Sequence, residues 1–244
     1  MKKLFYILCC MFAALLVGCE TKEPTNSENP NNPSSGEGSA NANPNANANA
    51  NGHAYVDLGL SVKWATCNVG ATSPEGYGDY FAWGETKPKA KYNWSTYKWC
   101  EGSYDTQTKY CTSSSYGTVD IKTILELSDD AANANWGGDW RMPTKAEQDE
   151  LRTQCTWTWT TKNGVNGYKV TSKTNGNSIF LPAAGNRSGS VLSSAGSSGY
   201  YWSSSLNYVD SDYACGLYFN WYDVDWGYGS YRNDGLSVRP VLRK

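Results

Sequence analysis

The chain has 244 residues, a formal net charge of −2 and an aromatic content of 14%, with 11 Trp and 18 Tyr. Its Lys and Arg residues form no clustered basic patch, which excludes recognition of a nucleic acid through its phosphates. So high an aromatic content also excludes a wholly disordered protein, and the length beyond the first fifth fits one folded domain.

The first 18 residues are typical of a signal peptide. Two lysines precede an apolar run over residues 4–17, which is shorter than the roughly 20 residues that a membrane-spanning helix needs. The run ends in LVGC at residues 16–19, and this ending resembles the lipobox of bacterial lipoproteins. The resemblance implies that Cys19 becomes the lipidated N-terminus, and that several acyl chains hold it stably in the membrane. An ordinary signal peptide with an incidental Cys is the alternative.

Residues 19–52 are predicted to form the lipidated cysteine and a disordered tether. Residues 20–52 are rich in Asn, Pro, Ser, Gly and Ala and have almost no large apolar side chains. They therefore bury too little surface to offset their chain entropy. We expect them to hold a domain of residues 53–244 away from the membrane. A low-complexity interaction tract built on the Asn-Ala repeats is the alternative.

Short strands separated by Gly-rich turns are predicted over most of this domain. A long loop is expected over residues 87–118. A clear helix begins after the capping box Thr144-Lys145-Ala146-Glu147 and ends near Cys155, and a weaker helix is expected over residues 122–132. These elements predict an α+β fold with small antiparallel sheets, one or two helices and long irregular loops. The expected strands cover residues 53–60, 61–69, 79–85, 156–161, 167–172, 178–181, 199–203, 213–219, 224–226 and 237–242.

Residues 199–241 combine an apolar framework with side chains drawn almost wholly from Tyr, Asp, Ser, Asn and Gly. This second set is typical of binding loops, in which Tyr supplies contact area and the small polar residues supply adaptable hydrogen bonds. We therefore predict a ligand-binding surface in this segment. The predicted ligand-binding residues are Tyr208, Asp210, Asp212, Tyr213, Tyr218, Asn220, Tyr222, Asp223, Asp225, Tyr228, Ser230, Tyr231, Asn233 and Asp234.

The alternation of side chains gives this segment an expected orientation. Leu217 and Phe219 are expected to be buried on one face of a strand, and Tyr218 to face outward. After a turn, Asp223 and Asp225 are expected to face outward beside Tyr218. A solvated sheet face is the alternative, and it explains the Asp and Ser residues but not so many exposed Tyr side chains.

Catalysis has little support in the sequence, and we expect the protein not to be an enzyme. The single His, His53, lies at the edge of the tether as an expected linker residue, so no Ser/His/Asp or Cys/His arrangement is available. Asp129 and Asp130 are expected to cap a helix or to pair with Arg141. Zinc needs clustered Cys and His, so no metal site and no cofactor are predicted. A structural calcium ion held by oxygen ligands stays open.

Five cysteines follow Cys19 in the sequence, and export permits disulfides. Cys100 and Cys111 flank one loop and are the preferred pair. Cys67 and Cys155 lie in apolar contexts, so we expect them to be buried free thiols. The odd count leaves at least one cysteine unpaired.

The domain also carries a series of short motifs: YVDLGL at 55–60, WATCNVGA at 64–71, GDYFAWGE at 78–85, WGGDWRMPT at 136–144, FLPAAG at 180–185, YWSS at 201–204 and SVRPV at 237–241. They resemble the Fibrobacter succinogenes major paralogous domain family, which is common in lipoproteins of gut Bacteroidales. The resemblance implies a C-type lectin-like fold, similar to that of the formylglycine-generating enzyme, in which residues 55–58 pair with residues 237–241. The enzyme's activity is not carried over, because it relies on two cysteines in its C-terminal part and only Cys215 lies there.

Residues 199–241 resemble, in addition, the variable region of proteins diversified by a diversity-generating retroelement. Randomising the two adenines of an AAC codon yields Tyr, Asp, Ser, Gly and Cys among others, which is largely the set found here. The resemblances predict a lipid-anchored protein of the outer membrane, exposed at the cell surface, that binds a protein, phage or glycan. The alternative is a structural or adhesin-like component of the cell envelope without a diversified site.

Overall fold

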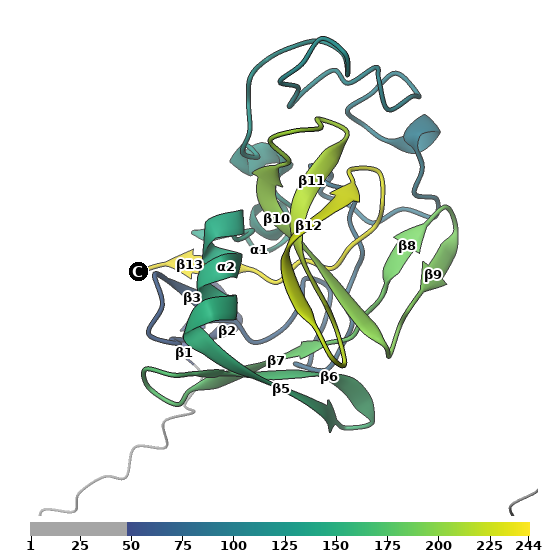
Figure 1. Ribbon diagram of the computed structural model, residues 1–244. Helices are drawn as coiled ribbons and strands as arrows, with labels where there is room; N and C mark the ends of the chain where they lie inside the picture. The colour runs from purple at the N-terminus through teal and green to yellow at the C-terminus, as the bar shows by residue number, and fades with distance from the viewer. Residues whose placement is uncertain (1–47) are drawn as a thin grey trace, which may run out of the picture. The chain divides into compact units, whose positions relative to one another are not determined.

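The computed structural model describes residues 48–244, without the side chains of residues 226–228. The predicted signal peptide, Cys19 and the tether up to residue 47 lie outside the described residues. The described residues form antiparallel sheets with few helices (Figure 1), which is consistent with an α+β or a mostly β protein. The predicted small antiparallel sheets and scarce helices are therefore confirmed.

One five-stranded sheet joins the beginning and the end of the described chain, in the order β1-β2-β3-β13-β4. The resemblance implied that residues 55–58 pair with residues 237–241. That pairing is wrong, because β3 lies between β2 and β13 and pairs with both. The strands are β1 (Ala48–Ala50), β2 (His53–Val56), β3 (Val62–Ala65), β4 (Trp140–Arg141) and β13 (Val241–Arg243).

The described domain begins before residue 53, because residues 48–56 form a hairpin. Asn51 and Gly52 make its two-residue turn with φ angles of 48° and 82°, as a type I′ turn requires. The ring of His53 then stacks on Trp136 at 3.8 Å between centroids, with 4° between the ring planes. His53 is therefore a packed residue of β2 and not an incidental residue of a linker.

A three-stranded sheet in the order β10-β11-β12 forms the centre of the domain, and both of its faces are covered. Trp202 packs into the core on one face. Leu217 and Phe219 pack on the other, as the alternation predicted. The strands span Ser198–Leu206, Tyr213–Asn220 and Val224–Tyr231.

Helix α2 (Lys145–Gln154) packs against this central sheet (Figure 1). The predicted capping box is present, with Thr144 and Glu147 bonded reciprocally. Gln148, which is 1% exposed, donates from Nε2 to the main-chain carbonyls of Tyr201 at 3.2 Å and Trp202 at 3.1 Å. The helix thereby fixes the course of β10.

The remaining strands form two further sheets, a three-stranded sheet of β5, β6 and β7 and the hairpin of β8 and β9. Tyr168 of β6 donates from its hydroxyl to the carbonyl of Asn220 at 3.0 Å, which joins the first of these sheets to the end of β11. The β8–β9 hairpin was not predicted. The strands are β5 (Cys155–Lys162), β6 (Val165–Ser172), β7 (Ser178–Pro182), β8 (Asn186–Ser188) and β9 (Val191–Ser193).

The weaker predicted helix lies further along the chain than expected. A short 3-10 helix, η2 (Leu127–Asp129), precedes α1 (Ala131–Trp136). Asp130 caps α1, accepting from the main-chain N–H groups of the helix's second and third residues at 2.8 and 3.0 Å. Because the cap fixes the start, the helix cannot begin at residue 122.

The other acidic residue of this pair has a different partner from the one expected. Asp129 pairs with Lys109 at 2.6 Å, while Arg141 pairs with Glu147 at 2.6 Å. The expected strand over residues 79–85 is reduced to a single bridge at Phe81. Two long-range hydrogen bonds hold this segment instead, from the Trp83 indole to Ser203 and from the Trp202 indole to Phe81.

The cysteines of the described chain are all free thiols, so the expected disulfide is not formed. The Cys100 thiol donates to the carbonyl of Trp94 at 3.2 Å, and the Cys111 thiol donates to that of Ser113 at 3.1 Å. Each sulfur is thus directed into its own turn. Cys155 is a buried free thiol, as predicted, whereas Cys67 is only half-buried.

Arg239 connects the five-stranded sheet to β7. Its side chain is 1% exposed, and its guanidinium donates to the Asn68 side chain at 2.8 Å. It also donates to the carbonyls of Ala65 at 3.1 Å, Thr66 at 2.9 Å and Phe180 at 3.0 Å. A buried arginine is tolerated when its donors are satisfied in this way.

Replacing Arg239 by Met should lower the free energy of unfolding by about 3 kcal/mol or more, because buried acceptors would be left without donors. Urea denaturation monitored by Trp fluorescence measures this. Arg243→Met, at an exposed position, is the matched control and should change stability by less than about 0.5 kcal/mol. Equal stability of the two variants would contradict the role assigned to Arg239.

Candidate functional site

The structure separates the predicted binding residues into two groups at opposite ends of β11. One group lies on the β10–β11 loop and around the end of β12, and the other lies around the β11–β12 turn. Because β11 has eight residues, its ends lie roughly 24 Å apart at a rise of about 3.4 Å per residue. The residues predicted to form one surface therefore lie in two separate places.

Four of the predicted residues are buried and do not face a ligand: Asp212, Asn220, Ser230 and Asn233 are 4–8% exposed. The side chain of Asn220 accepts from the main-chain N–H groups of Tyr222 at 3.0 Å and Asp223 at 3.1 Å, which fixes the β11–β12 turn. Asn220 thus serves the hydrogen bonding of its own turn, and Ser230 donates to Asp234, roles that Asn and Ser commonly take in loops.

The first group, which we call the tyrosine surface, is built on a chain of aromatic contacts. Tyr213 lies opposite Tyr231 in the strand register, and their ring centroids are 4.3 Å apart. Trp94, from the 3-10 helix η1 (Trp94–Thr96), contacts Tyr231 edge to face at 5.9 Å. Tyr231 is 43% exposed, so this chain of rings reaches solvent. The tyrosine surface comprises Trp94, Tyr116, Tyr208, Asp210, Tyr213 and Tyr231.

Hydrogen bonds fix the β10–β11 loop at this surface. Asn207 accepts from the main-chain N–H of Val209 at 2.8 Å and of Asp210 at 3.3 Å. The Tyr116 hydroxyl donates to the Asp210 carboxylate at 2.6 Å, and this hydrogen bond raises the pKa of Tyr116 to about 12. Tyr208, at the crest of the loop, is 85% exposed. The loop thus presents a phenol and a carboxylate in a defined arrangement.

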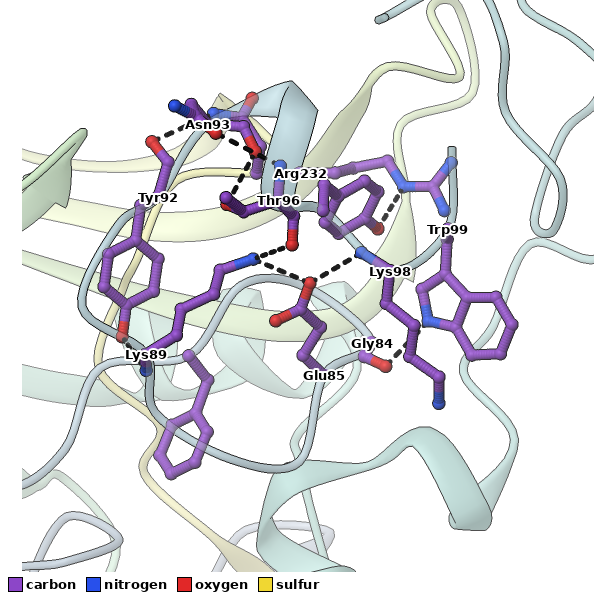
Figure 2. Close-up of polar contacts among 12 residues, drawn as sticks. Gly84, Glu85, Lys89, Tyr92, Asn93, Thr96, Lys98, Trp99 and Arg232 are labelled. Carbon is purple, nitrogen blue, oxygen red and sulfur yellow. Dashed lines mark hydrogen bonds and ion pairs between the residues drawn. The ribbon is translucent and has the colours of Figure 1, made fainter. Parts of the chain in front are cut away.

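Arg232 lies beneath the tyrosine surface, fully buried. Its guanidinium donates to the Tyr97 hydroxyl at 2.9 Å (Figure 2). It also donates to the main-chain carbonyls of Tyr110 at 3.1 Å, Ser211 at 2.9 Å and Lys109 at 2.8 Å. One side chain therefore holds the long loop, the β10–β11 loop and the end of β12 together.

The long loop predicted over residues 87–118 has its own internal network (Figure 2). Glu85 accepts from the Lys89 ammonium and from the main-chain N–H of Lys98, both at 2.8 Å. The side chain of Asn93 accepts from the main-chain N–H of Thr96 at 3.1 Å and caps η1. This network positions Trp94 against Tyr231, a contact that the sequence did not predict.

The second group, which we call the hairpin tip, is more exposed. Trp221 and Tyr222 are 67% and 70% exposed, with ring centroids 5.0 Å apart. Asp225 lies opposite Tyr218 in the register, and it faces outward, as predicted. Trp221 was not among the predicted residues. Tyr228 was among the predicted residues, but its side chain lies outside the described part of the chain. The hairpin tip comprises Tyr218, Trp221, Tyr222, Asp223 and Asp225.

Asp234 is the remaining predicted residue, and it lies partly buried below the surface. Burial raises the pKa of its carboxyl group to about 6, while hydrogen bonds from Ser230 and Ser188 act in the opposite direction. The Ser230 hydroxyl donates to the carboxylate at 3.3 Å. Asp234 is thus suited to a structural role sensitive to pH.

Within residues 48–244, no group of three or more His, Cys, Asp or Glu side chains is placed to hold a metal ion. Among the helices of the same residues, none has the length and apolar character needed to cross a membrane. Comparison of the chain with protein-family models, with curated proteins and with solved structures gave no match.

Asp234→Asn should change how stability depends on pH. A carboxyl whose pKa is raised from 3.8 to about 6 on folding stabilises the folded state fully below about pH 4, and this stabilisation is lost as the pH rises through about 6. The variant should therefore equal the parent near pH 4 and exceed it at pH 7 by on the order of 1 to 2 kcal/mol. Urea denaturation at both pH values measures the difference.

The matched control is Asp139→Asn, at an exposed position, which should change the free energy of unfolding by less than about 0.5 kcal/mol. A parallel shift of Asp234→Asn at both pH values would show that the carboxyl does not titrate between them.

Proposed function

We propose that the tyrosine surface binds a ligand and that the protein displays it at the cell surface as a lipoprotein. The observation that supports this most is the chain of contacts from Trp94 through Tyr231 to Tyr213, held from below by the buried Arg232. Aromatic rings that are held in place lose little entropy on binding. Such rings are frequent among the residues that dominate binding energy.

A protein ligand, including a phage coat protein, suits this surface best. Tyr208 lies on a protruding loop and is 85% exposed, whereas small ligands generally bind in concave sites. Asp210 and the neighbouring phenols offer hydrogen-bond acceptors to basic groups on such a partner. A glycan ligand is the other outcome that the experiment below distinguishes.

The proposed fold family is the C-type lectin-like fold. One sheet contains strands from both ends of the described chain, with β3 paired to β13, and this supports the proposal. The long loops on either side of η1 and the central β10-β11-β12 sheet support it as well. On this proposal the five-stranded sheet is the frame and the loops near β11 carry the ligand.

The display proposal is tested on cells that express the full chain, probed with fluorescent phage particles, outer-surface proteins and glycans. Replacing both Tyr213 and Tyr231 by Ala should lower binding at least about 10-fold, because two ring contacts are removed. The double variant Trp221→Ala, Tyr222→Ala at the hairpin tip is the matched control and should bind normally. Cys19→Ala should release the chain, and its binding activity, from the cells.

Binding that depends on the hairpin tip instead would overturn the assignment to the tyrosine surface. Failure of every probe to bind, together with recovery of the chain in an assembly of fixed stoichiometry, would favour the alternative of a structural envelope component.

We propose further that diversification by a retroelement acts only on exposed positions of residues 199–241. Buried Asn220 fixes the β11–β12 turn and buried Asn233 donates to the Tyr92 carbonyl at 3.4 Å, so both belong to the invariant frame despite their codon type. A template copy of the 3′ end of the gene, beside a reverse transcriptase gene, should therefore differ at adenines in the codons of Tyr208, Tyr213 and Tyr231. Sequencing the neighbouring DNA tests this, and a copy whose differences fall equally on the buried codons would contradict it.

A further inference from the structure

A cavity of about 480 Å³ lies beside the long loop and is lined by none of the tyrosine-surface residues. Its polar side chains are Asp79, Lys89 and Arg187, and Tyr80 and Tyr92 supply aromatic walls. This volume lies within the range typical of sites for small molecules. The cavity is therefore a candidate small-molecule site, separate from the proposed binding surface.

Arg187, from β8, is the unsatisfied charge in this cavity. Its guanidinium carbon lies 5.2 Å from the centroid of the Tyr80 ring. Within residues 48–244 the guanidinium of Arg187 makes no hydrogen bond and no ion pair. Arg232 and Arg239, by contrast, have hydrogen-bonded guanidinium groups. Five N–H donors in a planar fork are thus available to a ligand.

The backbone around Arg187 is held on two sides. Arg187 and Gly235 exchange two main-chain hydrogen bonds of 2.8 Å, and Tyr92 and Gly189 exchange two more of the same length. The Tyr92 ring packs directly on Gly235, where an added Cβ would lie 2.6 Å from the ring. The backbone of Arg187 and the Tyr92 wall are therefore placed by the fold before any ligand arrives, and the guanidinium lies against the Tyr80 ring.

The other two charged side chains have different roles. The Lys89 ammonium is bonded to Glu85 at 2.8 Å and to the Thr96 carbonyl at 3.0 Å (Figure 2), so its charge is already compensated. Asp79 lines the same cavity, and no described donor bonds its carboxylate. The cavity thus offers one open guanidinium and one open carboxylate.

We propose that this cavity binds a small carboxylate that also carries hydrogen-bond donors. The ligand carboxylate forms two parallel hydrogen bonds with the Arg187 guanidinium, and its hydroxyl or ammonium groups donate to Asp79. Two kinds of molecule share this chemistry, the hydroxy acids of sugar size and the α-amino acids. The inference does not depend on the function proposed for the tyrosine surface.

Isothermal titration of the detergent-solubilised full chain tests the proposal, with D-glucuronate and L-alanine as carboxylate probes and D-glucose as the neutral control. At least one carboxylate should bind, and D-glucose should bind at least about 10-fold more weakly. Arg187→Gln should weaken carboxylate binding at least about 10-fold, and Arg187→Lys should also weaken it, because a point charge cannot form the two parallel bonds. Arg243→Gln is the matched control and should bind normally.

Asp79→Asn distinguishes the two kinds of ligand. It should weaken binding of L-alanine more than binding of D-glucuronate, because an ammonium requires a charged partner more strongly than a hydroxyl does. Thermal melting of each variant shows whether it is folded, and Arg187→Lys keeps the cation beside Tyr80 should Arg187→Gln unfold.

The proposal is overturned if neither carboxylate binds at about 10 mM, or if the Arg187 variants that remain folded bind as the parent does. The double variant Tyr213→Ala, Tyr231→Ala should retain carboxylate binding. This result separates the two proposals, because loss of ligand binding at the tyrosine surface leaves the cavity intact.

Discussion

Two buried guanidinium groups hold the irregular parts of this domain to its sheets. Arg232 and Arg239 lie close together in the C-terminal part of the chain, and both are almost completely inaccessible to water. Their hydrogen-bond partners are main-chain carbonyls, one amide oxygen and one phenol oxygen. Burying a cation is costly unless its donors are satisfied, and loop carbonyls lack partners in a sheet. The loop carbonyls accept from the guanidinium donors, so both kinds of group are satisfied at once. Long ordered loops can therefore accompany small sheets in this domain.

The arrangement of the tyrosine surface follows from this constraint. Arg232 bonds to carbonyls on the long loop and on the β10–β11 loop, so the two loops that supply Trp94, Tyr116 and Asp210 share one support. The exposed rings lie on top of that support and not within the core. A surface built in this way can change its outward side chains without changing the contacts that order its backbone.

The features predicted best from the sequence are those that depend on residues close to one another along the chain. The capping box of α2 and the alternation of Leu217, Tyr218 and Phe219 are local patterns, and the structure confirms both. The pairing of β3 with β13 is a contact across most of the domain, and no local pattern distinguishes β2 from β3 as the partner. The burial of some predicted binding residues has a different cause. Asn is common both in binding loops and in turns, and the structure shows that Asn220 accepts from the N–H groups of the turn that follows it.

The partners of the buried arginines also have a consequence for the conditions that the domain tolerates. Salt bridges lose strength when their carboxylates are protonated, but amide and phenol oxygens keep their lone pairs in acid. Ser211, Tyr110 and Ala65 would go on accepting from the same guanidinium groups in mildly acidic surroundings. The guanidinium contacts that fasten the loops around β11 are therefore contacts that mild acidification leaves intact.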